Sequence, residues 1–242
     1  MADATSESES EVIDPVVPSR ADERARADLK GTSWVIFGAA GHARSIADVV
    51  ARLGGSVIAV VGQPDRAWTV PVLGRDDEGL DLAVREGHLV ALGIGSNSVR
   101  AVVLARCRAR GVSMPAIVAA TATISGNCTL GLGTVVLEHA HVGPSSRVGD
   151  GVIVNTGAIV EHDCAVANLV HLGPHSTALG GVRIDESAMI GSAACLLPGI
   201  IVGADATVGS GSIVCNDVPD RTTVVGVPAR VIHHNLTTRG GS

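Results

Sequence analysis

The sequence predicts two structural units in one chain, an α/β Rossmann-like domain followed by an all-β left-handed parallel β-helix of hexapeptide repeats. Three observations predict this fold class. An aliphatic side chain recurs at every sixth position through the second half of the 242 residues. In front of that repeat, short apolar stretches alternate with Gly-rich turns and segments of helical spacing. Aromatic residues make up only 1% of the chain against 30 glycines, which suits a narrow interior filled by Val, Ile, Leu and Ala.

The six-residue repeat defines the second unit. A period of six is neither the 3.6 of a helix nor the 2 of a single strand, and it fits a triangular coil with one short strand per side. Seventeen repeats of this kind form between five and six coils. The apolar positions, which keep one register throughout, are Val118, Ile124, Leu130, Val136, Val142, Val148, Val154, Val160, Val166, Leu172, Ala178, Ile184, Ile190, Leu196, Val202, Val208 and Val214.

The interior of each coil is expected to be narrow. Four positions after each aliphatic residue the side chain is small in nearly every repeat, so we expect it to point inward as well. Glycine directly follows the aliphatic residue in seven repeats, where we expect it to permit the backbone conformation of a corner. These glycines are Gly131, Gly143, Gly149, Gly173, Gly191, Gly203 and Gly209. So slender a prism is expected to form a homotrimer around a three-fold axis, with binding clefts between neighbours.

The N-terminal unit has a β-α-β pattern. We expect strands at residues 33–37, 56–61 and 88–94, a short strand or turn at 70–73, and helices at 43–53, 80–85 and 99–110. The turn between the first strand and the first helix has the position of a phosphate-binding loop, because glycine allows close approach and the helix offers free N–H groups. A plain strand-to-helix turn is the alternative. The residues of this turn are Gly38, Ala39, Ala40, Gly41 and His42.

The residues after the second expected strand limit the ligand that this turn could hold. A dinucleotide-dependent dehydrogenase needs an acidic residue there to hold a ribose, and this chain has Gly62, Gln63 and Pro64. Dehydrogenase function is therefore disfavoured, whereas a nucleotide or nucleotide sugar held in another way stays compatible with the turn.

Charge and composition exclude further classes. A net charge of −6 and the near absence of aromatic residues argue against binding of nucleic acid or a membrane surface. Residues 1–30 carry eight acidic and four basic groups, hence −4 of that total, and are expected to form a disordered acidic tail without a signal peptide. No apolar run is long enough to span a membrane. The five scattered cysteines are expected to fill the core in a reducing cytoplasm: Cys107, Cys128, Cys164, Cys195 and Cys215.

Five blocks of sequence resemble a known family. They are residues 38–42 (Gly-Ala-Ala-Gly-His), 93–97 (Gly-Ile-Gly-Ser-Asn), 155–164 (Asn-Thr-Gly-Ala-Ile-Val-Glu-His-Asp-Cys), 171–174 (His-Leu-Gly-Pro) and 225–230 (Val-Gly-Val-Pro-Ala-Arg). Over residues 31–232 the chain resembles the sialic acid O-acetyltransferase and nucleotide-sugar N-acetyltransferase family of hexapeptide-repeat enzymes.

The resemblance implies a trimeric, metal-free enzyme that transfers an acetyl group from acetyl-CoA to an amine or hydroxyl of a sugar. It implies that His162 is the general base, that Asp163 raises its basicity, and that the turn at 38–42 holds the nucleotide of the acceptor. The residues implied to contact acetyl-CoA, near its thioester or along its pantetheine arm, are His171, Gly180, Ser192 and Ser210.

The chemistry suits these residue types. The acceptor amine or hydroxyl must lose a proton as it attacks the thioester carbonyl, and a histidine base typically contributes ~10²–10⁴-fold to such a step. An adjacent carboxylate fixes the tautomer and stabilises the imidazolium that forms. His162 stands two residues after the inward Val160, so we expect it outside the coil near a corner.

Two departures from the family pattern leave the acceptor open. The entrance to the repeat has Ala119 and Ala120 where His-Pro is usual, and residues 62–64 lack the acidic group usually found near the nucleotide. An amine on a nucleotide-linked amino-dideoxy sugar is the preferred acceptor. The alternatives are O-acetylation of sialic acid or another sugar hydroxyl, and a non-catalytic nucleotide-sugar-binding scaffold. A zinc-dependent hydratase would need three converging imidazoles, and His139, His141 and His175 show no matching spacing.

The expected organisation therefore has four parts. The acidic tail covers residues 1–30, and the Rossmann-like nucleotide-sugar-binding domain covers 31–113. The left-handed β-helix acyltransferase domain covers 114–219 and a C-terminal extension covers 220–242. The expected partners are a small sugar or nucleotide-sugar acceptor and two further copies of the chain.

Overall fold

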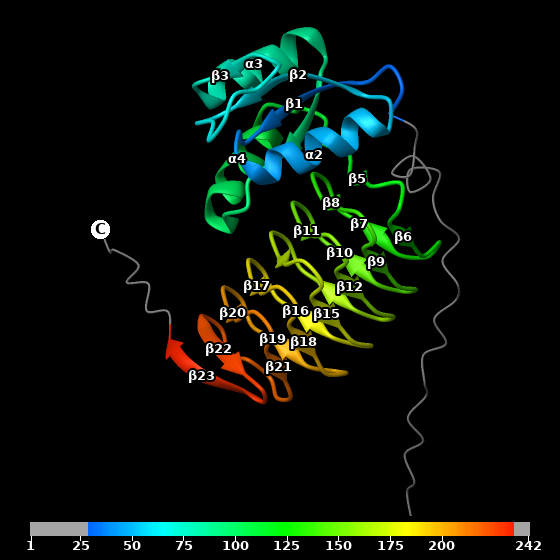
Figure 1. Ribbon diagram of the computed structural model, residues 1–242, viewed down its shortest axis with the longest axis vertical. Coiled ribbons are helices and arrows are strands. Elements are labelled where there is room, and N and C mark those ends of the chain that lie inside the picture. Colours follow the sequence, from blue (N-terminus) through cyan, green and yellow to red (C-terminus); the bar gives the residue numbers. More distant parts are fainter. Residues whose placement is uncertain (1–28, 235–242) are drawn as a thin grey trace, which may run out of the picture.

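The computed structural model describes residues 29–234 and divides them into an α/β unit and a parallel β-helix (Figure 1). The α/β unit covers the first coils of the β-helix, and the later coils extend away from it (Figure 1). The expected tail at residues 1–30 lies outside the described residues except for its last two. Of these, Leu29 is buried and its backbone N–H donates to the Leu53 carbonyl at 2.9 Å.

A four-stranded parallel sheet with the strand order β3-β2-β1-β4 forms the centre of the α/β unit. The predicted α/β pattern is confirmed, with some different boundaries. The helix expected at residues 80–85 begins earlier than the apolar spacing predicts, because Asp76, Asp77 and Glu78 favour a helix N-terminus. The elements are β1 (Ser33–Phe37), α2 (Gly41–Arg52), β2 (Ser56–Val61), β3 (Val72–Leu73), α3 (Asp76–Glu86), β4 (Leu89–Leu92) and α4 (Asn97–Ala109).

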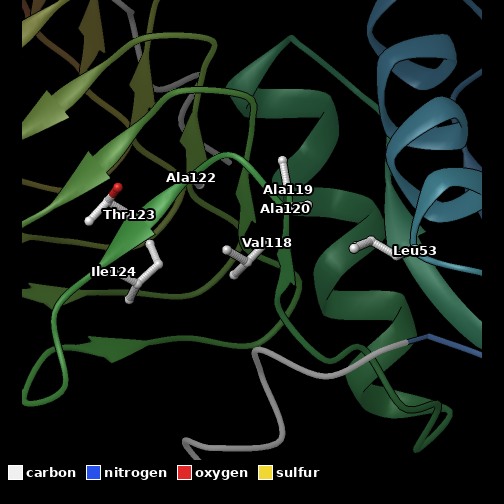
Figure 2. A pocket seen from close by; sticks show the side chains of 7 residues that line it. All are labelled: Leu53, Val118, Ala119, Ala120, Ala122, Thr123 and Ile124. Atoms are coloured by element: carbon white, nitrogen blue, oxygen red, sulfur yellow. The ribbon is translucent and has the colours of Figure 1, made fainter.

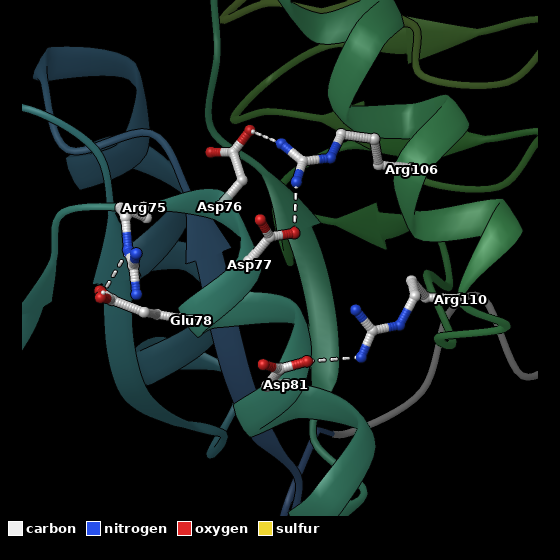
Figure 3. Close-up of polar contacts among 7 residues, drawn as sticks. All are labelled: Arg75, Asp76, Asp77, Glu78, Asp81, Arg106 and Arg110. Carbon is white, nitrogen blue, oxygen red and sulfur yellow. Dashed lines mark hydrogen bonds and ion pairs between the residues drawn. The ribbon is translucent and has the colours of Figure 1, made fainter.

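Ion pairs join α3 to α4 on the outer side of this unit (Figure 3). Arg106 of α4 contacts both Asp76 and Asp77, and Arg110, which directly follows α4, contacts Asp81. All of these side chains are substantially exposed, so each pair contributes at most about 1 kcal/mol. The network orients α4 rather than building a site.

The β-helix consists of three sheets, in which paired strands lie eighteen residues apart except at the last two strands of the first sheet. The domain-facing sheet contains β5 (Ile117–Val118), β8 (Val135–Val136), β11 (Ile153–Val154), β14 (His171–Leu172), β17 (Met189–Ile190), β20 (Thr207–Val208), β22 (Thr222–Gly226) and the antiparallel β23 (Ala229–His234). We call the second sheet the half-buried sheet, because most of its outward side chains are half-buried. It contains β6 (Thr123–Ile124), β9 (His141–Val142), β12 (Ile159–Val160), β15 (Thr177–Ala178), β18 (Cys195–Leu196) and β21 (Ile213–Val214). The arginine sheet contains β7 (Thr129–Leu130), β10 (Arg147–Val148), β13 (Ala165–Val166), β16 (Arg183–Ile184) and β19 (Ile201–Val202).

The predicted interior of the coils is confirmed. The repeating aliphatic residues form one continuous buried cluster together with the small residues four positions later. Buried hydroxyls also tie successive coils together. The Ser146 hydroxyl donates to the Glu161 carbonyl at 2.7 Å and accepts from the Cys164 N–H at 3.1 Å, so this polar group is satisfied inside the stack.

The glycines that follow the aliphatic residues have a different role from the predicted one. Their φ angles are not positive, and the left-handed position of each corner lies two residues later. A Cβ at Gly143 would stand 2.8 Å from the Glu161 carbonyl carbon, and one at Gly191 would stand 2.5 Å from the Ser210 nitrogen. Glycine is needed there because the next coil passes against it, which is a packing requirement and not a dihedral one.

The α/β unit packs on the domain-facing sheet through apolar side chains. Ile117, Val135 and Ile153 point outward from the first three strands of this sheet and share a buried cluster with Ile46 and Val50 of α2. His171 is the next outward residue of this sheet, so it stands where the covered part ends.

The cysteines only partly match the prediction. Cys107, Cys128 and Cys164 are buried, whereas Cys195 is half-buried and Cys215 is exposed. Cys215 is not a core filler because it follows β21 at the outside of a corner. Among residues 29–234 no helix is long and apolar enough to cross a membrane.

Candidate active site

His162 and Asp163 form a hydrogen-bonded pair at the corner between the half-buried and arginine sheets. The Nδ1 of His162 lies 2.7 Å from the Oδ2 of Asp163. A carboxylate oxygen can only accept, so Nδ1 carries the proton and Nε2 keeps its lone pair. The side chains are 58% and 60% exposed, and Asp163 has a φ of 59°. The structure therefore confirms that this histidine lies outside the coil, next to a carboxylate that fixes its tautomer.

Gly180 occupies the same corner one coil later, directly beside the imidazole. A Cβ at position 180 would stand 2.5 Å from both the Cε1 and the Nε2 of His162. The Gly181 N–H also donates to the His162 carbonyl at 2.9 Å, which fixes the backbone at His162. The absence of a side chain at Gly180 thus leaves the space in which the ring lies.

His171 points outward from β14 and has hydrogen-bond partners on both ring nitrogens. Nδ1 lies 3.3 Å from the Gly95 carbonyl oxygen and Nε2 lies 3.2 Å from the Asn155 Nδ2. Asn155 accepts from the Thr156 N–H through Oδ1, so its amide nitrogen is the donor to His171. Nδ1 therefore carries the proton. Burial, together with Arg100, lowers the pKa of His171 to about 4, so the ring is neutral at pH 7.

The turn at 38–42 brings His42 next to His171. Helix α2 begins at Gly41, and its N-cap residue Ala40 makes no side-chain capping bond. The His42 ring lies 6.3 Å from that of His171, and its Nε2 is buried without a partner among the described residues. Burial, then His171 and Arg100, lower the pKa of His42 to about 4. The turn thus presents open backbone N–H groups beside an unsatisfied neutral imidazole.

Sequence reasoning missed Arg100, which is completely buried in α4. Its guanidinium donates to the carbonyls of Ile94 and Gly95 at 2.9 and 3.1 Å, and to those of Gly151 and Leu169 at 2.7 and 2.8 Å. The available signal was helical spacing, because Arg100 shares the buried face of α4 with Val103, Leu104 and Cys107.

An acidic residue near the turn was also missed. Asp65, one position beyond the Gly-Gln-Pro segment at 62–64, accepts from both terminal nitrogens of Arg44 at 2.6 Å. The Arg44 guanidinium lies 5.9 Å from the ring centroid of Trp68, whose Nε1 donates to the Ala39 carbonyl at 2.9 Å. The segment after β2 is therefore fastened onto the turn.

The remaining predicted contacts lie elsewhere on the chain. Ser192 and Ser210 are exposed at the corner between the domain-facing and half-buried sheets, whereas Gly180 is at the other corner of the half-buried sheet. The structure thus brings together His162, Asp163 and Gly180, and separately joins His171 to the turn at 38–42. One chain alone does not unite these two groups.

Two pockets adjoin the interface between the units. One, of about 400 Å³, lies between residues 95–98 and the later coils, and includes Met189, Asp205 and Thr207. The other, of about 410 Å³, lies at the entrance of the β-helix, where Ala119 and Ala120 face Leu53 (Figure 2). Within residues 29–234 no cluster of His, Cys, Asp and Glu is placed to hold a metal ion.

Comparison with known proteins places the chain in a family. The PglD N-terminal domain family matches residues 34–107. A histidine-to-asparagine variant of perosamine N-acetyltransferase from Caulobacter crescentus, solved with CoA and GDP-perosamine, is 35% identical, with a TM-score of 0.80 over 86% of this chain and 100% of that one. The chain belongs to the nucleotide-sugar N-acetyltransferase family. The PglB acetyltransferase domain from Neisseria gonorrhoeae agrees, with 31% identity and a TM-score of 0.77 over 84% of this chain and all of that one.

A more distant relative shares the acyltransferase character of this nucleotide-sugar N-acetyltransferase. Serine acetyltransferase from Escherichia coli is 38% identical over 101 residues, which is 40% of this chain but only 33% of that enzyme. The predicted fold class and the predicted CoA-dependent acetyltransferase class are confirmed. Solved relatives contain CoA or acetyl-CoA, in agreement with the predicted co-substrate. These relatives support the N-acetyltransferase part of the resemblance and not its sialic acid part.

Proposed function

We propose that this nucleotide-sugar N-acetyltransferase transfers the acetyl group of acetyl-CoA to the amino group of a nucleotide-linked amino-dideoxy sugar. The observation that carries the proposal is the His162–Asp163 pair, with Gly180 leaving room at the imidazole. Nε2 of His162 accepts the proton that the amine loses as its nitrogen bonds to the carbonyl carbon. The carbon–sulfur bond then breaks, and the thiol of CoA is released when the imidazolium returns the proton.

The turn at 38–42 is the proposed site of the acceptor's diphosphate. Uncapped N–H groups at the start of α2 suit a phosphate, and the unpartnered Nε2 of His42 can hydrogen-bond a ligand there. His171 of the β-helix lies beside His42 of the turn and is hydrogen-bonded to Gly95 in the loop before α4, so the acceptor would extend from the turn along the domain-facing sheet. His171 itself is no proton acceptor, because both of its ring nitrogens are engaged.

A homotrimer would complete this site. The half-buried sheet presents Ile159, Thr177, Cys195 and Ile213 outward, all half-buried and uncharged, whereas the arginine sheet is exposed and the domain-facing sheet is partly covered. With the half-buried sheets turned toward a three-fold axis, the two corners that flank this sheet meet between neighbours. His162 and Gly180 of one copy would then face Ser192, Ser210 and the turn of the next, enclosing acetyl-CoA between them.

The proposal is tested by measuring CoA release with a panel of acceptors. The panel contains GDP-, UDP- and dTDP-linked 4-amino-4,6-dideoxy sugars, the matching 4-hydroxy sugars and free sialic acid. We expect turnover only with amino sugars, its loss in His162→Asn, and a trimer by light scattering for both proteins. Turnover with a hydroxyl acceptor would establish O-acetylation instead, and binding without CoA release would establish a scaffold.

The proposed location is the cytoplasm, where acetyl-CoA is made and where thiols stay reduced. In the described part of the chain all five cysteines are thiols, and Cys215 is exposed to solvent.

A further inference from the structure

A buried polar network connects the two units at the proposed active site, and Arg100 is at its centre. Its guanidinium contacts two carbonyls of the loop before α4 and two carbonyls of the β-helix. Its Nη2 also donates to Asn97 Oδ1 at 2.7 Å, while Asn97 donates to the Ser187 carbonyl at 2.7 Å. A single side chain therefore satisfies the carbonyls of the buried residues Gly151 and Leu169 in the β-helix and ties them to the loop before α4.

The Gly95 carbonyl is the link between this network and His171. It accepts from Arg100 Nη1 at 3.1 Å and from His171 Nδ1 at 3.3 Å. A carbonyl oxygen has two lone pairs and can serve both donors. If Arg100 did not hold residues 94–97 against the β-helix, Gly95 could move away and His171 would lose the acceptor that fixes its tautomer.

We propose that Arg100 is a positioning residue of the acetyl-transfer site, which fixes the Gly95 carbonyl and thereby holds His171 in its Nδ1–H tautomer against the turn that receives the acceptor. Arg100 does not contact the reacting atoms. It acts through His171, whose ring lies beside His42 where the α/β unit meets the coils. The kinetic part of this inference rests on the proposed function, whereas its structural part does not.

Few charged or titratable groups face His171 among residues 29–234. Helix α2 contributes His42 and α4 contributes Arg100, while the loop before α4 contributes the Gly95 carbonyl and the β-helix contributes Asn155, both uncharged. Burial lowers the pKa of Arg100 only to about 10, so it stays charged at neutral pH. Burial, with this positive charge as a smaller cause, keeps both imidazoles neutral, so Nε2 of His171 remains a hydrogen-bond acceptor for Asn155.

The test uses the ring ¹⁵N chemical shifts of His171 in the full-length protein, assigned by comparison with His171→Gln. In the wild type we expect a protonated Nδ1 and a bare Nε2 throughout pH 6–8. In Arg100→Lys, which keeps the charge but cannot reach all four carbonyls, we expect the two shifts to move toward each other as tautomers mix. Arg108→Met is the matched control, because it removes a surface ion pair between the same helix and Asp150 of the β-helix.

Kinetics provide the second readout. We expect kcat to fall about 10-fold or more in Arg100→Lys and to stay within about 2-fold of the wild type in Arg108→Met. Unchanged ¹⁵N shifts in Arg100→Lys would overturn the proposal, and so would a wild-type His171 with a bare Nδ1. If the wild type acetylates no nucleotide sugar, the proposed function fails while the ¹⁵N experiment still decides the role of Arg100.

Discussion

His162 and Gly180 lie one coil apart at the same corner, and the imidazole occupies the space that a side chain at position 180 would fill. A Cβ there would stand 2.5 Å from Nε2, the nitrogen that we propose accepts the proton. This relationship connects the repeat to the chemistry. An eighteen-residue coil places a glycine next to the proposed base, and His162 is held from one side by Asp163 and from the other by the following coil.

The substitution Gly180→Ala is therefore expected to impair catalysis without unfolding the protein. The methyl group would force the His162 ring out of its position, and misplacing a base by about 1 Å can cost ~100-fold in rate. We expect kcat to fall about 10- to 100-fold with little change in melting temperature. Gly126→Ala is the control, since it lies three coils before Gly180 at the same corner and its Cβ would meet nothing within 4 Å. Equal activity of the two variants would remove Gly180 from the site.

The substitution Asp163→Asn tests the carboxylate. Asparagine tolerates the left-handed conformation that Asp163 adopts at φ 59°, so the corner should keep its backbone. The amide cannot stabilise the imidazolium as a carboxylate does, and we expect kcat to fall about 10-fold or more. Asp163→Ala would add backbone strain and is expected to lower stability as well. Steady-state kinetics and thermal unfolding separate the two effects, and undiminished kcat in Asp163→Asn would argue against the assigned role.

The imidazoles of His42 and His171 make the stability of the fold depend on pH. His42 and His171 both have a pKa of about 4 in the folded chain, below the ordinary value of 6.5. The unfolded chain therefore binds protons at a higher pH than the folded one, so unfolding is favoured as the pH drops from 6.5 toward 4. Each histidine is expected to contribute up to about 1.4 kcal/mol per pH unit in that window and nothing above it.

Urea titrations between pH 4 and 8 measure this dependence. The variant His42→Asn should show a shallower loss of stability between pH 6.5 and 4 than the wild type, because it removes one of the two groups. His175→Asn is the control, since that ring is exposed at a corner. A wild type with the same free energy of unfolding at pH 5 and pH 7 would contradict the lowered pKa values.

The repeat made the β-helix predictable, because every inward position is constrained by the same narrow space. Residues such as Val136, Val154 and Leu172 follow one period, and the period alone indicates which sheet each belongs to. The corner position of His162 followed from its distance to Val160. The role of the corner glycines could not be predicted in this way. Glycine is selected both by a positive φ and by close approach of a neighbouring backbone, and a sequence does not distinguish the two causes.

The polar network at the domain interface was not predictable from the sequence for a different reason. Arg100 lies on the buried face of α4. Because arginine is mostly found at protein surfaces, its sequence position does not by itself indicate burial. Its partners are backbone carbonyls, among them Gly151 and Leu169, which have no side-chain signature. Contacts of this kind depend on how the two units dock, and only the three-dimensional structure specifies that.

Sharing of the site between copies can be tested by mixing two inactive variants. One protein carries His162→Asn and the other carries His171→Gln. These positions lie on different sides of the prism, so a site formed by two neighbours could combine an intact His162 from one chain with an intact His171 from the next. In trimers assembled at random from equal amounts, about one site in four would regain both side chains.

We expect the refolded mixture to recover about a quarter of wild-type activity, while each variant refolded alone stays inactive. The control mixes His162→Asn with Asp163→Ala, which are two changes at the same corner. In this mixture an intact His162 can come only from the Asp163→Ala chain, which lacks the carboxylate beside it. That mixture should be no more active than Asp163→Ala itself, because about half of its sites lack an intact His162. Failure of the first mixture to recover activity, with mixed trimers verified by mass spectrometry, would mean that His162 and His171 serve a site within one chain or that only one of them serves it. Recovery would show that the corner with His162 in one copy faces His171 and the turn at 38–42 in another. This is the arrangement expected if the half-buried sheets pack around the three-fold axis.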